Sequence, residues 1–169
     1  PRVPRFRSDQ KKLEWMRKEA LLSARDPRVV SHASSLVHDL RPDDWSGQIN
    51  RIHEWVRDHI RYQHDPAQQE ELAPTPLVLE RGFDDCDGKA RLAAALALSL
   101  GIQATVHPMW KGPMLCHVQT AYRWPGSDRY PGAREGGWVV GELTVKGARL
   151  GQDPRSIALN PDTGKLPLS

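Results

Sequence analysis

The run from Gly88 to Leu100 constrains the fold of this chain more than any other feature. Its sequence, GKARLAAALALSL, consists almost entirely of alanine and leucine. Both residues are strong helix formers, and a helix that is apolar on most of its sides must be buried on most of its surface. We therefore predict a central helix at 88–100 that other elements surround.

The segments on either side of this helix differ in their apolar period. Before it, apolar residues at helical spacing predict helices from Ser8 to the stop at Pro27, at about 28–40 and at about 45–60, and a short helical turn at 77–80. After Gly101, short β-rich runs separated by Gly- and Pro-containing turns predict successive antiparallel strands at 102–110, 115–124 and 137–145.

This order of elements predicts an α+β fold, with N-terminal helices and a central helix packed on one antiparallel sheet. The chain of 169 residues is short enough for a single domain. We expect residues 1–7 to form a basic extended arm, residues 8–151 to form the domain, and residues 152–169 to form an irregular C-terminal tail. The polar segment 63–76 is expected to be a surface loop.

Composition limits the classes of partner and compartment. No apolar run approaches the ~20 residues of a membrane span, so we expect no membrane association. The net charge is only +3, but seven basic residues fall within the first eighteen: Arg2, Arg5, Arg7, Lys11, Lys12, Arg17 and Lys18. A solvated helix face is the simplest interpretation, an anionic partner for the arm is the alternative, and nucleic acid is not expected. Two cysteines make no disulfide framework and favour a reducing compartment, so we predict cytoplasmic localisation.

One of the two cysteines, Cys86, stands where the central helix begins. A helix N-terminus favours a thiolate and offers unpaired N–H groups to an oxyanion, whereas the acidic neighbours Asp84, Asp85 and Asp87 oppose ionisation of the thiol. A cationic partner is therefore needed, and a histidine is the natural one. His117 lies in the second predicted strand, and alternation places it on the face opposite to Cys116.

Three segments in order resemble the transglutaminase-like superfamily, which has a papain-type fold. They are FDDCDGKARLAAALALSLGI, CHVQTAYRW and GWVVGELT, and IHEWVRDHIRY resembles the family's lead-in helix. The resemblance implies that Cys86 is the nucleophile, His117 the base and Glu142 the acid that orients the imidazole. Two positions depart from the family pattern: Asp84 stands where a glycine is usual, and Glu142 where an aspartate is usual.

The resemblance implies a cysteine peptidase or amidase that cleaves an amide or peptide bond of a protein or peptide through an acyl-enzyme. Acyl transfer to an amine and a non-catalytic binding module are the alternatives. The Cys86 N–H is a candidate oxyanion donor, with Gln63 as a candidate for the second. No cofactor or metal is implied.

Other chemistry is less well supported by the spacing. His53 and His59 lie six residues apart, which does not place them together on a helix, and we interpret them as part of a polar face. A zinc site would have to combine Cys86, Cys116, His107 and His117 without any paired CxxC spacing. We expect Cys116 to pack inward, and a disulfide between Cys116 and Cys86 would block the nucleophile.

Overall fold

The computed structural model describes residues 6–65 and 72–152. Residues 1–5 of the predicted basic arm at 1–7 and all but the first residue of the predicted tail at 152–169 lie outside these residues, so both stay predictions. Within the described part of the chain, no helix is long and apolar enough to cross a membrane.

The helices begin and end close to where the sequence predicts them. Their bounds are α1 Asp9–Ser23, α2 Pro27–Val37, α3 Trp45–His59, α4 Thr75–Arg81 and α5 Cys86–Ser99. Side-chain caps set several of the starts: the Ser8 hydroxyl accepts from the Lys11 N–H, and Asp85 caps α5. The prediction of five helical segments is confirmed, and α5 begins two residues earlier than its apolar run.

The strands form one antiparallel sheet in the order β3 (Gln103–Lys111), β4 (Met114–Arg123) and β5 (Val139–Gly141). The third strand is much shorter than predicted, because the chain leaves the ladder after Gly141. A parallel pair of two-residue strands, β1 (Arg61–Tyr62) and β2 (Phe83–Asp84), was not predicted, and it ties the end of α3 to the start of α5.

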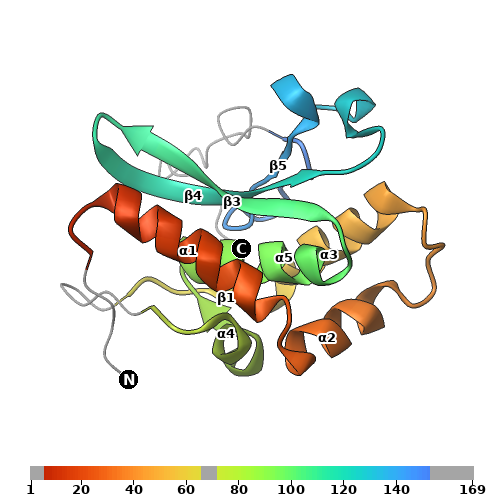
Figure 1. Cartoon of the computed structure of the whole chain (residues 1–169), viewed down its shortest axis with the longest axis horizontal. Helices are drawn as coiled ribbons and strands as arrows, with labels where there is room; N and C mark the ends of the chain where they lie inside the picture. Colours follow the sequence, from red (N-terminus) through yellow and green to blue (C-terminus); the bar gives the residue numbers. More distant parts are fainter. Residues whose placement is uncertain (1–5, 66–71, 153–169) are drawn as a thin grey trace.

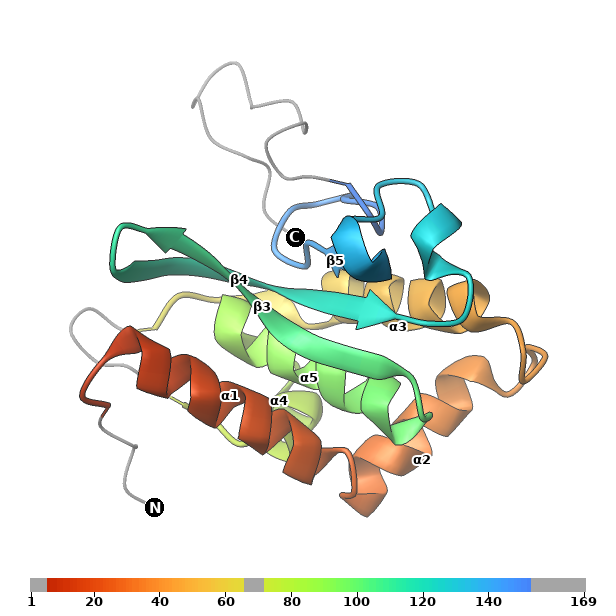
Figure 2. The same cartoon turned by 45° about the horizontal axis from the view of Figure 1, so that its top comes forward.

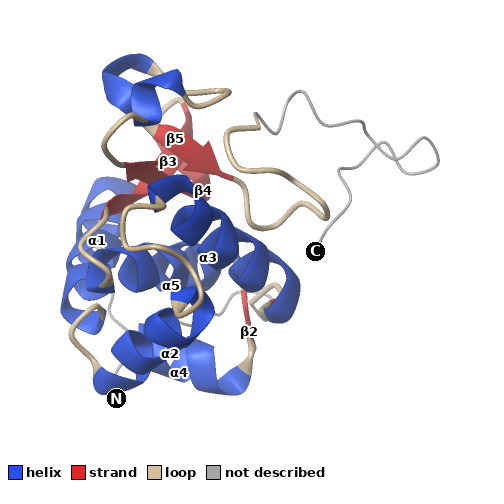
Figure 3. Ribbon diagram, turned by 90° about the vertical axis from the view of Figure 1, so that its right-hand side faces the viewer, coloured by secondary structure: helices blue, strands red, loops and turns tan. Residues whose placement is uncertain are grey.

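The central position of α5 organises the molecule (Figure 1). The sheet covers one side of α5, and α1, α2, α3 and α4 surround the rest of it (Figure 2). Viewed from the side, the strands lie above a layer of helices (Figure 3). All residues of α5 from Asp87 to Ala97 are buried. The predicted α+β class, with a central helix packed on an antiparallel sheet, is confirmed.

A β-bulge interrupts the pairing of β3 and β4 next to His117. Met109 pairs with His117 and Trp110 pairs with Leu115, so Cys116 is an extra residue on β4. A bulge breaks the strict alternation of side chains and re-aims them. The prediction that Cys116 packs inward is wrong: its side chain is exposed, and its thiol donates to the Met109 carbonyl at 3.1 Å. Both cysteines are free thiols.

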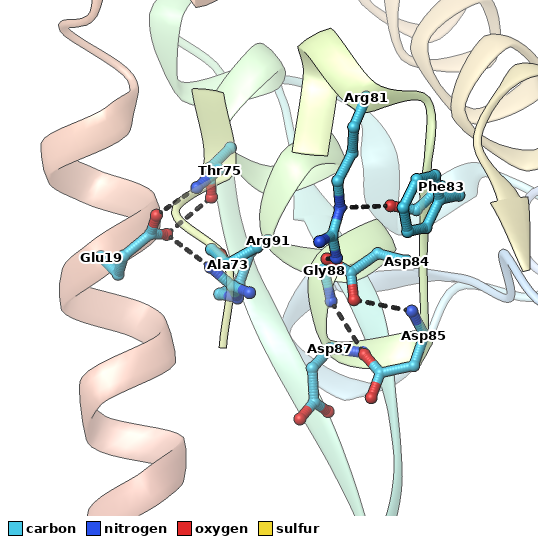
Figure 4. Close-up of polar contacts among 10 residues, drawn as sticks. All are labelled: Glu19, Ala73, Thr75, Arg81, Phe83, Asp84, Asp85, Asp87, Gly88 and Arg91. Atoms are coloured by element: carbon cyan, nitrogen blue, oxygen red, sulfur yellow. Dashed lines mark hydrogen bonds and ion pairs between the residues drawn. The ribbon is translucent and has the colours of Figure 1, made fainter. Parts of the chain in front are cut away.

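A buried ion pair joins α1, α4 and α5 (Figure 4). The fully buried Arg91 donates from Nη1 to the Ala73 carbonyl at 2.8 Å, and the same nitrogen lies 3.2 Å from Glu19 Oε2. Glu19 also accepts from the backbone N–H and the hydroxyl of Thr75, both at 2.6 Å. A single carboxylate therefore links three helices around the core.

The turn that leads into α5 depends on a glycine one helical turn after Asp84. The Asp84 side chain is buried, lies 2.8 Å from Arg81 Nη2 and accepts from the Asp85 N–H at 2.7 Å (Figure 4). A Cβ at Gly88 would overlap the Asp84 carboxyl group. Gly82, two residues before Asp84, ends α4 in the left-handed conformation with φ +75°.

Gly88→Ala is expected to lower the free energy of unfolding by about 1 to 3 kcal/mol, because the buried Asp84 carboxyl group has to move from its ion pair. Urea unfolding followed by circular dichroism measures this change. Ser99→Ala, at the other end of α5, is the control and is expected to stay within about 0.5 kcal/mol of the unmodified chain. A Gly88→Ala variant as stable as that control would contradict the steric argument.

Candidate functional site

Cys86 is the first residue of α5, and its thiol lies beside β4. The Asp85 carboxylate starts the helix by accepting from the backbone N–H groups of Asp87 at 3.0 Å and Gly88 at 3.4 Å. The half-buried Cys86 side chain packs on a small apolar cluster that includes Leu13 and Val118. The backbone of Val118 also hydrogen-bonds to the thiol. Cys86 is thereby held next to Val118, the residue that follows His117 in the chain.

Glu142 lies directly behind the imidazole of His117. Its Oε2 lies 2.8 Å from His117 Nε2 and accepts from Gln119 Nε2 at 3.0 Å. Its Oε1 accepts from the Thr144 backbone N–H at 3.0 Å and from the Thr144 hydroxyl at 2.7 Å. An ionised carboxylate only accepts hydrogen bonds, so the proton of the His117–Glu142 contact belongs to Nε2. His117 Nδ1 is then the nitrogen that can receive a proton.

The carboxyl group of Glu142 is ionised although it is only 1% exposed. Burial opposes its ionisation, but the hydrogen bond and charge of His117 and the hydrogen bonds from Thr144 outweigh burial and lower its pKa from 4.5 to about 2. The sheet and the loop that follows β5 therefore hold a permanent negative charge behind the imidazole.

This lowered pKa predicts a loss of stability in acid. Because the folded-state pKa lies below the unfolded value, the contribution of Glu142 is complete above about pH 5 and is lost as the pH falls towards 2. The difference corresponds to about 3 kcal/mol. Urea unfolding between pH 7 and pH 2 measures it. In Glu142→Gln the fall across this range should be smaller by about that amount, and an unchanged fall would contradict the assignment.

Cys86 and His117 line the same small pocket, whose volume is about 140 Å³. The other lining residues are Lys12, Asp85, Asp87, Leu115 and Cys116. The structure thus brings together Cys86, His117 and Glu142 from α5, β4 and the segment after β5. Their catalytic roles stay predictions.

The charges around the Cys86 thiol disfavour its ionisation. Burial raises the thiol pKa well above its usual value, and the negative charges of Asp87 and Asp85 raise it further. Asp87 Oδ1 lies 3.5 Å from Cys86 Sγ and accepts the thiol proton in a hydrogen bond. Burial and the acidic neighbours therefore outweigh the stabilisation of a thiolate that was expected from the helix N-terminus. The thiol holds its proton in the resting protein.

Asp85, which caps α5, shares this acidic environment. Burial and the charges of Asp87, Asp84 and Asp65 raise the pKa of its carboxyl group to about 8. At neutral pH a proton therefore resides on Asp85 for most of the time, which limits the negative charge at the pocket.

Several residues near the site were missed by the sequence analysis. Gln119 and Thr144 follow His117 and Glu142 by two residues each, so their positions could have been inferred from strand alternation and from the GELT segment. The position of Tyr62 in β1 near the site could not be inferred in this way. Burial, and then the charge of Cys86, raise the pKa of its hydroxyl group to about 12. Gln63, the candidate oxyanion donor, is exposed and accepts from Arg61 at 3.2 Å instead of lining the pocket.

The arrangement offers little support for a metal. Among the described residues, the one group of acidic, histidine and cysteine side chains close enough for a shared ion is Asp65, Asp84 and Asp85. Asp84 is already engaged by Arg81 and by the Asp85 backbone. The zinc ligands considered from the sequence, Cys86, Cys116, His107 and His117, do not form such a group. His107 Nε2 instead lies 3.2 Å from Arg134 Nη1. We assign no metal to this site.

The interpretation of His53 as part of a polar helix face is wrong. His53 is fully buried, and its Nε2 lies 2.8 Å from the Ala148 carbonyl oxygen, so it donates to that group. His53 also borders a larger pocket of about 590 Å³ between α3 and residues 130–132 and 149–152. Among the described residues that line this pocket there is no Cys, Ser, Thr or Lys.

Comparisons with known proteins give a family and a fold. A family model described as the transglutaminase-like superfamily matches residues 34–140. No curated protein matches the chain. Among solved structures, the chain resembles the crystal structure of "a putative protease" from Parabacteroides distasonis ATCC 8503, with a TM-score of 0.57 and 13% sequence identity. The similarity covers 82% of this chain but only 27% of that one.

Proposed function

This chain belongs to the transglutaminase-like superfamily, and we propose that it is a thiol-dependent hydrolase that cleaves an amide or peptide bond. The observation that carries the proposal is the shared pocket of Cys86 and His117, with the ionised Glu142 hydrogen-bonded to the far side of the imidazole. The protease description of the similar solved structure agrees with hydrolysis.

In the first half of the reaction, His117 Nδ1 takes the thiol proton as Cys86 Sγ attacks the carbonyl carbon of the substrate. General-base assistance is required because the resting thiol is protonated. The Cys86 N–H, in the first turn of α5, has no partner within the helix and can donate to the developing oxyanion. The imidazolium then gives its proton to the leaving nitrogen, the C–N bond breaks, and the acyl group remains on Cys86 as a thioester.

In the second half, water replaces the amine. His117 Nδ1 takes a proton from water as the oxygen attacks the thioester, and the returning proton restores the thiol as the carboxylic acid leaves. Glu142 stabilises the imidazolium in both halves and keeps the Nε2 proton in place, so that Nδ1 always faces the reaction.

The first test is alkylation of the two thiols by iodoacetamide, read by peptide mass spectrometry between pH 5 and pH 9. We expect His117→Ala to slow the alkylation of Cys86 about tenfold at neutral pH. The rate at the exposed Cys116 in the same molecules reports on access, and His59→Ala is the matched control. Equal rates at Cys86 with and without His117 would overturn the pairing of thiol and imidazole.

The second test follows products from a library of fluorogenic peptide amides, with and without a labelled amine. Cleaved carboxylic acids support hydrolysis, whereas incorporation of the amine into the products would replace it with acyl transfer. In Cys86→Ala, turnover should vanish. A biological activity that survives this substitution would mean that the chain acts as a binding module.

A further inference from the structure

Helix α1 reaches the thiol pocket although it lies before the region that matches the family, residues 34–140. Leu13 belongs to the apolar cluster on which Cys86 packs. At the start of the same helix, Asp9 Oδ2 accepts from the Leu115 N–H at 2.8 Å, just before the bulge at Cys116. One helix thus contacts both the element that carries the thiol and the strand that carries the imidazole.

Lys12 in this helix forms an ion pair beside the thiol. Its Nζ lies 2.8 Å from Asp87 Oδ2, and the two side chains are only 16% and 8% exposed. Lys12 is also one of the residues that line the pocket. Its neighbour Lys11 differs in this respect: the Lys11 side chain is 65% exposed and pairs with Glu14 on the helix surface. The expectation of a solvated basic face therefore holds for Lys11 but not for Lys12.

The two oxygens of Asp87 have different partners. Oδ2 is held by Lys12, and Oδ1 lies 3.5 Å from Cys86 Sγ. The ammonium group therefore fixes the carboxylate that contacts the thiol and offsets its charge. A pair so shielded from solvent is little screened by salt.

The charged and titratable groups that face this thiol come from four elements and the segment after β5. Among the described residues they are Lys12 of α1, Tyr62 of β1, Asp85 and Asp87 at the start of α5, Cys116 and His117 of β4, and Glu142 behind His117. Among these groups, Lys12 is the one that carries a positive charge independently of the proton transfer itself.

From this arrangement we propose that Lys12 is a positioning residue for the Cys86 nucleophile, holding the Asp87 carboxylate and offsetting its charge next to the thiol. The inference rests on the proposed function, and it assigns a part of the site to a helix outside the family match. The acidic neighbours of Cys86 predict a need for a cation, and Lys12 supplies this role beside His117.

Loss of the Lys12 charge is expected to shift the pKa of the Cys86 thiol in a defined direction. An unpaired Asp87 repels the thiolate more strongly, so the thiol is expected to ionise at a higher pH and to react more slowly at neutral pH. Loss of the Asp87 charge has the opposite effect, because it removes a negative charge that disfavours the thiolate. If Lys12 acts only through Asp87, its removal has no further slowing effect once Asp87 is neutral.

The test measures the pH dependence of Cys86 alkylation by iodoacetamide, with Cys116 in the same molecules as the reference for access. We expect Lys12→Met to slow the reaction of Cys86 at pH 7 about three- to tenfold and to move its pH profile upward by about half to one unit. Lys12→Arg should restore the rate. Lys12→Met/Asp87→Asn should react no more slowly than Asp87→Asn, and Lys11→Met is the matched control.

Two results would overturn the inference. One is a Lys12→Met profile identical to that of the unmodified chain. The other is a rate lowered equally at every pH and not recovered in Lys12→Met/Asp87→Asn, which would indicate that Lys12 only supports the structure. The proposed function fails separately, when His117→Ala leaves Cys86 alkylation unchanged, so the two failures are distinguishable.

Discussion

Replacing Glu142 by glutamine is expected to lower the rate of amide hydrolysis about 100- to 10,000-fold without unfolding the protein. The reason is the set of donors around the carboxylate. The Thr144 backbone N–H can only donate, so the amide oxygen of the new side chain stays on that side. The amide NH₂ group then faces His117 Nε2, which has to become an acceptor.

This change of partner forces the wrong tautomer of the imidazole. With Nε2 unprotonated, the proton of neutral His117 moves to Nδ1, the nitrogen that has to receive the thiol proton. The measurement is kcat/KM for a fluorogenic amide, with circular dichroism to verify the fold. Glu54→Gln, at an exposed position in α3, is the control. A Glu142→Gln variant that keeps more than about a tenth of the activity would contradict this role of Glu142.

Replacing Glu19 by alanine is expected to lower the free energy of unfolding by about 3 to 5 kcal/mol, because it leaves the Arg91 guanidinium charged and buried. The substitution also removes the acceptor for both Thr75 donors at the start of α4. Arg91 would keep the Ala73 carbonyl and its position 5.1 Å from the centre of the Trp15 ring, neither of which neutralises the charge.

Urea unfolding measures this effect, and the same helix supplies the control. Glu14 in α1 is itself partly exposed and pairs with the exposed Lys11, so Glu14→Ala is expected to cost less than about 1 kcal/mol. Replacing Arg91 by methionine in the Glu19→Ala background should recover part of the loss, because no buried charge then remains without a partner. If Glu19→Ala were no less stable than Glu14→Ala, the ion pair would not stabilise the fold.

Local patterns in the sequence determined much of this protein. The alanine- and leucine-rich run of α5 requires a surrounding layer on every side, and the caps and prolines bound the helices. The shared location of Cys86 and His117 could be predicted because a thiol at a helix start and an imidazole on a following strand make an ordered pattern along the chain. The position of Glu142 beside His117 was also predicted, although Glu142 lies beyond the end of β5 rather than within a strand.

Contacts between distant segments decided the rest. The bulge that exposes Cys116 depends on the register of β3 against β4, and the burial of His53 depends on the loop that carries Ala148. The pairing of Lys12 with Asp87 joins residues far apart in the chain, and a run of basic residues contains nothing that separates Lys12 from Lys11. A periodic pattern reports which face of an element is buried, whereas charge pairing, strand register and the ionisation of a thiol depend on which elements meet.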